Sequence, residues 1–328
     1  MKSRWGRWLL VALLVSACAP AASLDRAGSP ALAAHNDTST PFNVVSIPAL
    51  SEHRYDGHGF TVTGVLASTP AFTRYAVRYR SGPRTLTGVV NVPSGAGPHP
   101  VVVIAHGWTP PEAYRTGSML EREQAYLAGH GFAAFQVDYR NHAGSTRETD
   151  RPVARPLGYP QDVIDAVRAL RRAQPSWADP DRIGLLGRSM GGGVALDVLV
   201  TRPHLVDAAV LYSPVSSWAG DNFDRWVRGS GELEEKVVAA YGRPAANPAF
   251  WRRASARAYA SRVAVPVQIH HGTADTVCPV RWSRATAGAL AAAGKQVRLF
   301  EYDGQGHRFD EGWPTFMRRT VAFFTATL

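Results

Sequence analysis

Short apolar runs alternate with amphipathic segments along most of this 328-residue chain. Continuous runs of apolar residues predict buried strands, at residues 100–105, 133–138, 183–187, 208–212, 265–270 and 297–302. Apolar positions at helical spacing predict helices, over residues 121–128, 161–172, 194–200 and 313–327. Strands and helices that alternate in this way indicate an α/β fold with a doubly wound, mostly parallel sheet.

The N-terminal part of the domain departs from this alternation. Residues 74–79 and 86–92 flank a turn-forming stretch at residues 81–84, which predicts a hairpin and an antiparallel N-terminal edge of the sheet. Residues 44–73 hold short segments and many glycines. We interpret them as an N-terminal extension packed on a domain that spans residues 44–328.

One long interval, residues 214–262, lacks a strand pattern but carries several aromatic residues. An insertion that leaves the carboxyl end of a strand lies over the ligand site in sheets of this kind. We therefore predict a small helical cap here. Its aromatic side chains either shape a substrate pocket or only pack the insertion onto the body, and the sequence leaves both interpretations open.

The sequence Gly187-Arg188-Ser189-Met190-Gly191 follows a predicted strand and precedes a predicted helix. Gly-x-Ser-x-Gly in this context is typical of a nucleophile elbow, a tight turn that lifts the serine hydroxyl out of the backbone. We predict that Ser189 is a catalytic nucleophile. The alternative is a glycine-rich turn with an incidental serine. The glycine patterns of phosphate-binding loops do not fit this stretch.

A serine nucleophile needs a histidine base, and in this fold class the base is the last triad member along the chain. His307 lies in a glycine-rich loop between the last predicted strand and the final helix, where that base is expected. The other histidines after Ser189 fit worse. His204 follows the elbow helix, at the wrong side of the sheet, while His270 and His271 end a strand and suit structural hydrogen bonds.

The carboxylate that orients the base is expected between the nucleophile and the histidine. Asp275 lies in the loop after the penultimate strand, which makes it our candidate. Asp303 competes, but it lies four residues before His307 in the same turn and is therefore less suited to face its ring.

An oxyanion hole for acyl transfer needs two backbone N–H donors. Met190 supplies one by its position after the nucleophile, and we assign the other to Trp108, in the loop after the strand at 100–105. We expect His106 to hold that loop. The histidines and Cys278 have no recognised metal-ligand spacing, so we expect neither a metal nor a cofactor.

The N-terminus has the pattern of an export signal. Positive residues precede an apolar run over residues 8–15, which is too short to span a membrane. Residues 15–18 read Val-Ser-Ala-Cys and resemble a bacterial lipobox. We predict a lipoprotein-type signal peptide over residues 1–17 and lipidation of Cys18. The alternative is an ordinary cleavage site and a secreted protein.

Residues 18–43 are rich in small and polar residues and predict a flexible tether. The protein is therefore expected in the bacterial cell envelope, tethered to a membrane. The chain has two cysteines. If Cys18 carries lipid, Cys278 has no partner for an intrachain disulfide.

The chain is strongly basic, with a formal net charge of +10 and a sequence pI of about 10.0. The positive residues are scattered, and no basic stripe or nucleic-acid recognition motif is visible. We therefore expect no nucleic-acid partner.

Several ordered motifs resemble those of the α/β-hydrolase catalytic domain in the prolyl oligopeptidase family (serine peptidase family S9). They are the elbow, Ala-His-Gly-Trp at 105–108, Val-Asp-Tyr-Arg at 137–140, the loop from His271 to Asp275, and Gly306-His307. The resemblance implies that the triad is Ser189, Asp275 and His307, and that the substrates are peptides or acyl-peptides.

Two features of that family do not carry over. Too few residues precede residue 75 for the β-propeller that usually restricts these peptidases to short peptides. Dipeptidyl specificity is therefore not expected. The residues around Ser189 and Trp108 are also similar to those of secreted cutinase-like polyester hydrolases. Those enzymes typically have a C-terminal disulfide, which we do not expect in this chain.

Together these patterns predict a serine hydrolase that works through an acyl-enzyme and acts on a peptide, an acyl-peptide or a carboxylic ester. One alternative is a carboxylesterase or cutinase-like enzyme without peptidase activity. Another is a catalytically silent envelope binding protein that keeps the fold.

Overall fold

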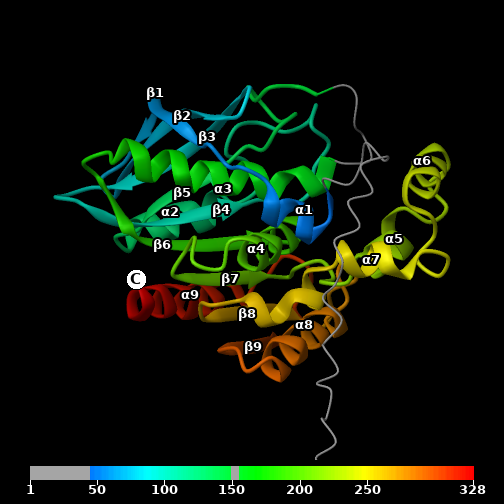
Figure 1. Cartoon of the computed structure of the whole chain (residues 1–328). Coiled ribbons are helices and arrows are strands. Elements are labelled where there is room, and N and C mark those ends of the chain that lie inside the picture. Colours follow the sequence, from blue (N-terminus) through cyan, green and yellow to red (C-terminus); the bar gives the residue numbers. More distant parts are fainter. Residues whose placement is uncertain (1–44, 149–154) are drawn as a thin grey trace, which may run out of the picture. The chain divides into compact units, whose positions relative to one another are not determined.

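The computed structural model describes residues 45–148 and 155–328 (Figure 1). The predicted signal peptide, Cys18 and the tether lie outside the described residues. Within the described part, no helix combines the length and the apolar character that crossing a membrane requires.

Nine strands form one mixed sheet in the order β1-β2-β3-β5-β4-β6-β7-β8-β9. The first three strands and the β3–β5 pair are antiparallel, and the other neighbours are parallel. This arrangement confirms the predicted fold class. The strands are β1 (His58–Ser68), β2 (Phe72–Ser81), β3 (Arg84–Pro93), β4 (His99–Ala105), β5 (Ala133–Val137), β6 (Ala178–Arg188), β7 (Ala208–Tyr212), β8 (Val267–Gly272) and β9 (Val297–Tyr302).

The outermost N-terminal strand is β1, a strand that the sequence pattern did not reveal. The predicted hairpin is present as β2 and β3, but β1 pairs with β2 and forms the actual edge. Phe60 is the only buried residue among the eleven of β1. Because the strand is exposed on both faces and its register shifts three times, it lacks the alternation that marks a half-buried strand.

Helices cover both faces of the sheet (Figure 1). Alternate residues of the central strands face opposite layers, so that Val101 and Val103 of β4 join one core cluster and Val102 and Ile104 join another. The first cluster includes residues of α1 (Ile47–Glu52), α3 (Arg155–Ala173), α4 (Met190–Thr201) and α8 (Arg281–Ala292). The second includes residues of α2 (Glu121–Gly129) and α9 (Trp313–Thr327).

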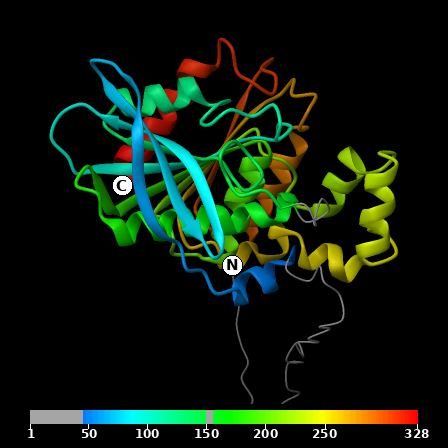
Figure 2. The same cartoon turned by 90° about the horizontal axis from the view of Figure 1, so that it is seen from above.

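The interval between β7 and β8 is helical, with α5 (Ala219–Trp226), α6 (Glu232–Tyr241), α7 (Pro248–Arg253) and the 3-10 helix η2 (Ala256–Arg262). Figures 1 and 2 show α5 and α6 projecting beyond the sheet. Four aromatic residues of the insertion, Phe223, Tyr241, Phe250 and Trp251, belong to a buried cluster that is separate from the two sheet cores and also includes Val45. These side chains stabilise the insertion itself. Trp226, by contrast, is 41% exposed.

Candidate active site

Ser189 lies in the turn between β6 and α4, as the elbow pattern predicts. Its φ of 56° and ψ of −122° are unusual for a residue with a side chain and are typical of strained functional turns. The two flanking glycines are required by close backbone contacts. A Cβ on Gly187 would lie 2.2 Å from Gly191 O, and one on Gly191 would lie 2.0 Å from Ala105 O. The turn therefore packs directly against β4.

The loop after β4 passes beside Ser189. A Cβ on Gly107 would lie 3.2 Å from Ser189 Cβ, and Trp108 follows with its side chain 64% exposed. Met190 is the first residue of α4, so its N–H has no carbonyl of that helix to bond. The backbone N–H groups of Trp108 and Met190 thus belong to the two segments that adjoin Ser189.

His106 is wholly buried at the start of this loop. Its Nδ1 lies 2.7 Å from Gly107 O, so Nδ1–H donates to that carbonyl. Burial lowers the pKa of His106 to about 3, and the ring is therefore neutral. Its ring also stacks on Tyr114 at a centroid distance of 4.4 Å. This environment agrees with a role in holding the loop.

Asp275 and His307 come together from the loops that follow β8 and β9. His307 Nδ1 lies 2.7 Å from Asp275 Oδ2, although the two residues are 32 positions apart. The loops approach closely because Gly272 has no side chain; a Cβ there would lie 2.1 Å from Gln305 O. The competing acid, Asp303, accepts a hydrogen bond from Thr273 Oγ1 at 3.0 Å instead.

Asp275 is held by further donors that the sequence did not reveal. His271 Nε2 lies 3.1 Å from Asp275 Oδ2, and the N–H groups of Val277 and Cys278 donate to Oδ1 at 2.8 and 2.9 Å. Burial would raise the pKa of Asp275, but the hydrogen bonds from His271 and His307 outweigh it and hold this pKa well below its usual value. The carboxylate therefore stays ionised at neutral pH.

His271 is itself fixed by two more contacts. Its Nδ1 lies 2.6 Å from Ser283 Oγ, and its Nε2 lies 2.7 Å from Cys278 O. Because both neighbours of Nε2 are acceptors, Nε2 carries the proton and Nδ1 accepts from Ser283. The predicted structural role of His271 thus includes support of Asp275, which only the folded chain shows.

Cys278 connects Ser189 to the loop of Asp275. Its side chain is fully buried and lies beside the side chain of Ser189. Among the described residues, no hydrogen bond joins Ser189 Oγ to His307. The contacts therefore run from Ser189 through Cys278 and Asp275 to His307, and bring the three predicted triad residues to one end of the sheet.

The helical insertion is tied to this end of the sheet. Arg225 of α5 donates through Nη2 to Thr276 O at 2.5 Å, one residue after Asp275. Trp226 packs edge-on against Trp282 of α8 at a centroid distance of 5.5 Å. The insertion thus adjoins the loop of Asp275.

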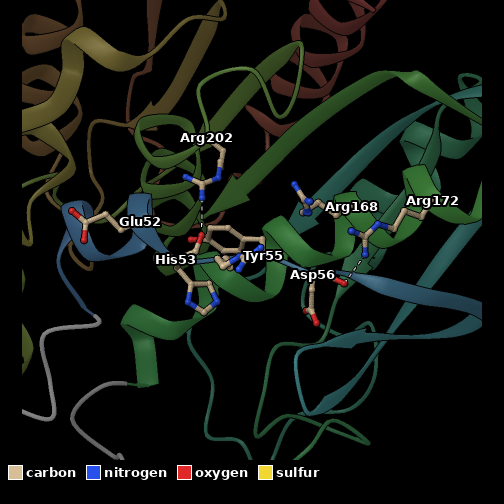
Figure 3. A pocket seen from close by; sticks show the side chains of 8 residues that line it. Glu52, His53, Tyr55, Asp56, Arg168, Arg172 and Arg202 are labelled. Atoms are coloured by element: carbon tan, nitrogen blue, oxygen red, sulfur yellow. Dashed lines mark hydrogen bonds between the residues drawn. The ribbon is translucent and has the colours of Figure 1, made fainter.

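Figure 3 shows a hollow of about 690 Å³ that Arg202 helps to line. Because Ser189 and Arg202 cap the two ends of α4, this hollow lies at the opposite end of that helix from Ser189. The 12-residue helix separates the two ends by about 18 Å. Arg202 and Arg172 each donate to backbone carbonyls of the segment before β1, so they anchor that segment. The hollow is lined by Glu52, His53, Arg54, Tyr55, Asp56, Arg168, Arg172 and Arg202.

Within the described ranges, no three or more His, Cys, Asp or Glu side chains are grouped as a metal site would require. Cys278 is a free cysteine.

Comparison with known proteins gives a family match. Residues 118–328 match the profile of the prolyl oligopeptidase family. The acylamino-acid-releasing enzyme of Rattus norvegicus is 27% identical over 221 residues, which is 65% of this chain but 29% of the rat enzyme. The 2,6-dihydropseudooxynicotine hydrolase of Paenarthrobacter nicotinovorans is 27% identical over 201 residues, covering 57% of this chain and 47% of that protein. The chain thus spans less than half of either relative.

Solved structures share the fold. An acetyl xylan esterase from Paenibacillus sp. R4 aligns with a TM-score of 0.63 and 21% identity, over 86% of this chain and 92% of the esterase. The acylaminoacyl peptidase of Pyrococcus horikoshii aligns with a TM-score of 0.62 and 23% identity, over 79% of this chain and 42% of the peptidase.

Proposed function

Because the chain belongs to the prolyl oligopeptidase family, we propose that it is a serine hydrolase with the triad Ser189, Asp275 and His307. The observation that carries this proposal is the 2.7 Å hydrogen bond between Asp275 and His307, close to a serine on a strained elbow. Such a pair prepares a histidine for proton transfer, and the elbow presents a hydroxyl to it.

The hydrogen bond sets the tautomer of His307. Ionised Asp275 accepts from Nδ1–H, so Nε2 keeps its lone pair and can take the Ser189 proton. For this step, Ser189 Oγ must leave Cys278 and meet Nε2. Catalytic hydrogen bonds of this kind often form only once substrate is bound.

The reaction then follows from the positions of the groups. Ser189 Oγ attacks the substrate carbonyl while His307 takes its proton, and the N–H groups of Trp108 and Met190 stabilise the oxyanion. Protonated His307 gives its proton to the leaving group as the carbonyl–leaving-group bond breaks. A water molecule, deprotonated by His307, hydrolyses the acyl-enzyme and frees Ser189.

The substrate is a peptide, an acyl-peptide or a carboxylic ester. Relatives named as acylamino-acid-releasing enzymes support acyl-peptides. An esterase that aligns along nearly its whole length supports esters. The pure carboxylesterase is therefore retained as the second candidate.

One purified sample tests both hypotheses, the peptidase and the pure carboxylesterase. We expect a fluorophosphonate probe to label wild-type protein at Ser189 and to leave Ser189→Ala unlabelled. Turnover of p-nitrophenyl acyl esters and of N-acyl-aminoacyl nitroanilides then distinguishes ester from peptide substrates. Strong ester turnover without nitroanilide cleavage would contradict the peptidase hypothesis. A folded protein that neither reacts with the probe nor turns over either substrate would instead be a silent binding protein.

We also propose that residues 1–17 are a signal peptide, that Cys18 is lipidated and that residues 18–43 tether the domain to the cell envelope. Support comes from the sequence pattern at residues 8–18. Expression in a bacterial host should leave the protein in the membrane fraction, with the mass of a lipid-modified N-terminal peptide. Cys18→Ala should release it to the soluble fraction; a membrane-bound Cys18→Ala variant would contradict the proposal.

A further inference from the structure

Arg188 is a buried cation directly before the nucleophile. It ends β6 and is only 6% exposed. Its Nε is enclosed and has no hydrogen-bond partner among the described residues. No hydrogen bond or ion pair to its other guanidinium nitrogens is present in that part of the chain either. Its guanidinium carbon lies 5.5 Å from the centroid of the Tyr212 ring.

The charges around Arg188 do not compensate it. Among the charged side chains that act most strongly on Arg188, Glu123 attracts its guanidinium, whereas Arg308 and Arg122 repel it. Glu123 Oε1 already accepts from Arg122 Nε at 3.0 Å and from Trp313 Nε1 at 2.7 Å. A buried guanidinium without an anion or acceptor is unfavourable. Packing alone therefore does not account for a charged residue at this position.

Tyr212 connects Arg188 to the loop that carries His307. Tyr212 Oη accepts a hydrogen bond of 2.7 Å from the N–H of Phe309, two residues after His307. Arg188 thus lies against the residue that anchors the His307 loop. In acyl transfer this histidine delivers the proton to the leaving group, so Arg188 adjoins the leaving-group side of the site.

We propose that Arg188 is a specificity-determining residue that binds a carboxylate on the leaving-group portion of the substrate. This inference rests on the proposed function. A guanidinium can donate two parallel hydrogen bonds to a carboxylate, which would satisfy donors that are unpartnered in the described structure. In a peptide the carboxylate would be the free C-terminus of a short released fragment. In an ester it would be an acid group on the released alcohol.

Two pairs of substrates that differ mainly in charge test the proposal. The ester pair is the acetyl ester of 3-hydroxybenzoate and that of 3-hydroxybenzamide, with each rate divided by that of spontaneous hydrolysis. The peptide pair is N-acetyl-Ala-Ala with a free carboxylate and with a terminal amide. In at least one pair, wild-type kcat/KM should favour the carboxylate about 10- to 100-fold, the range expected for hydrogen bonds to a charged group. The pair that shows the preference identifies the source of the carboxylate.

The variants Arg188→Met and Arg188→Lys resolve the role of the guanidinium. Arg188→Met should lower the carboxylate-to-amide preference about tenfold or more, and Arg188→Lys should restore part of it. If Arg188→Met does not fold, wild-type inhibition decides: 3-hydroxybenzoate should compete at least tenfold better than 3-hydroxybenzamide.

Three outcomes would overturn the inference. Wild-type protein that labels at Ser189 but shows no carboxylate preference in either pair would remove it and leave the proposed function intact. If Arg188→Met slows both members of each pair equally, the inference is also contradicted and the proposed function stays intact. Arg188 would then have only a structural role. Absence of both turnover and labelling would remove the proposed function and this inference together.

Discussion

Asp275 Oδ2 and His307 Nδ1 are 2.7 Å apart, and the loops that carry them lie at the ends of neighbouring parallel strands, β8 and β9. Each loop alone is an ordinary glycine-containing turn. Their register brings an ionised carboxylate to one nitrogen of an imidazole, and no hydrogen bond from a described residue reaches the other nitrogen. This pairing is the physical basis of the proposed mechanism.

Asp275→Asn should lower kcat by about three to four orders of magnitude, as loss of the orienting carboxylate does in serine hydrolases. The amide can donate to Nδ1, which forces the His307 proton onto Nε2 and removes the base. Esterase kinetics on one chromogenic substrate would measure the effect. Asp303→Asn is the matched control, because Asp303 bonds Thr273 and not His307. A larger loss in Asp303→Asn than in Asp275→Asn would contradict the assignment.

His271→Phe should lower kcat about tenfold with little change in KM, because it removes a donor that fixes Asp275 without touching substrate. His271→Gln can keep one N–H near the carboxylate and should recover part of the loss. Steady-state kinetics on folded samples, checked by near-UV circular dichroism, would measure both. Equal losses in the two variants would mean that His271 acts through packing alone.

Much of the fold could be predicted from the sequence because its central strands are buried on both faces. Strands such as β4 and β7 are continuous apolar runs, and this pattern is hard to confuse with a loop. The strand β1 could not be predicted, since ten of its eleven residues are exposed and burial supplies the periodic signal. Its position depends on hydrogen bonds to β2, which no local pattern encodes.

The candidate site, too, could be predicted only in part. Ser189, Asp275 and His307 could be singled out because each lies in a short motif after a strand. The supporting contacts could not, because they join residues through the folded chain. The bond from His271 to Asp275 and the contact of Cys278 with Ser189 depend on how the loop after β8 folds back. The helical insertion is a further example. Its aromatic residues indicated that side chains are buried there, but the sequence did not indicate which residues they pack against.

Cys278 should be unreactive in the folded protein although it lies beside Ser189. Burial raises the pKa of its thiol to about 12, and only the thiolate reacts with alkylating reagents. In a Cys18→Ser background, iodoacetamide at pH 8 should label Cys278 only after unfolding in guanidinium, as mass spectrometry would show. Labelling of the folded protein at the rate of the unfolded protein would contradict this. Cys278→Ala should retain activity within about tenfold of wild type, because its thiol takes no proton in the proposed reaction.

Asp197 on α4 should make the domain less stable as pH rises. Burial raises the pKa of its carboxyl to about 8, whereas an unfolded aspartate titrates near about 3.9. Between these values the folded state binds a proton that the unfolded state has lost. Stability therefore falls with rising pH across this window, and the full penalty is present above about pH 8.

Asp197→Asn removes this titrating carboxyl group. The stability of the variant relative to wild type should therefore increase as pH rises. Because the Asp197 side chain is only partly buried by surface area, we expect a modest gain. The difference in melting temperature between the variant and wild type should be about 2–4 °C larger at pH 9 than at pH 5. This change corresponds to about 1 kcal/mol in the free energy of unfolding. Calorimetry at both pH values would measure it, with Asp181→Asn at an exposed position as the control. An unchanged difference between pH 5 and pH 9 would show that Asp197 has the same proton affinity in the folded and unfolded chains.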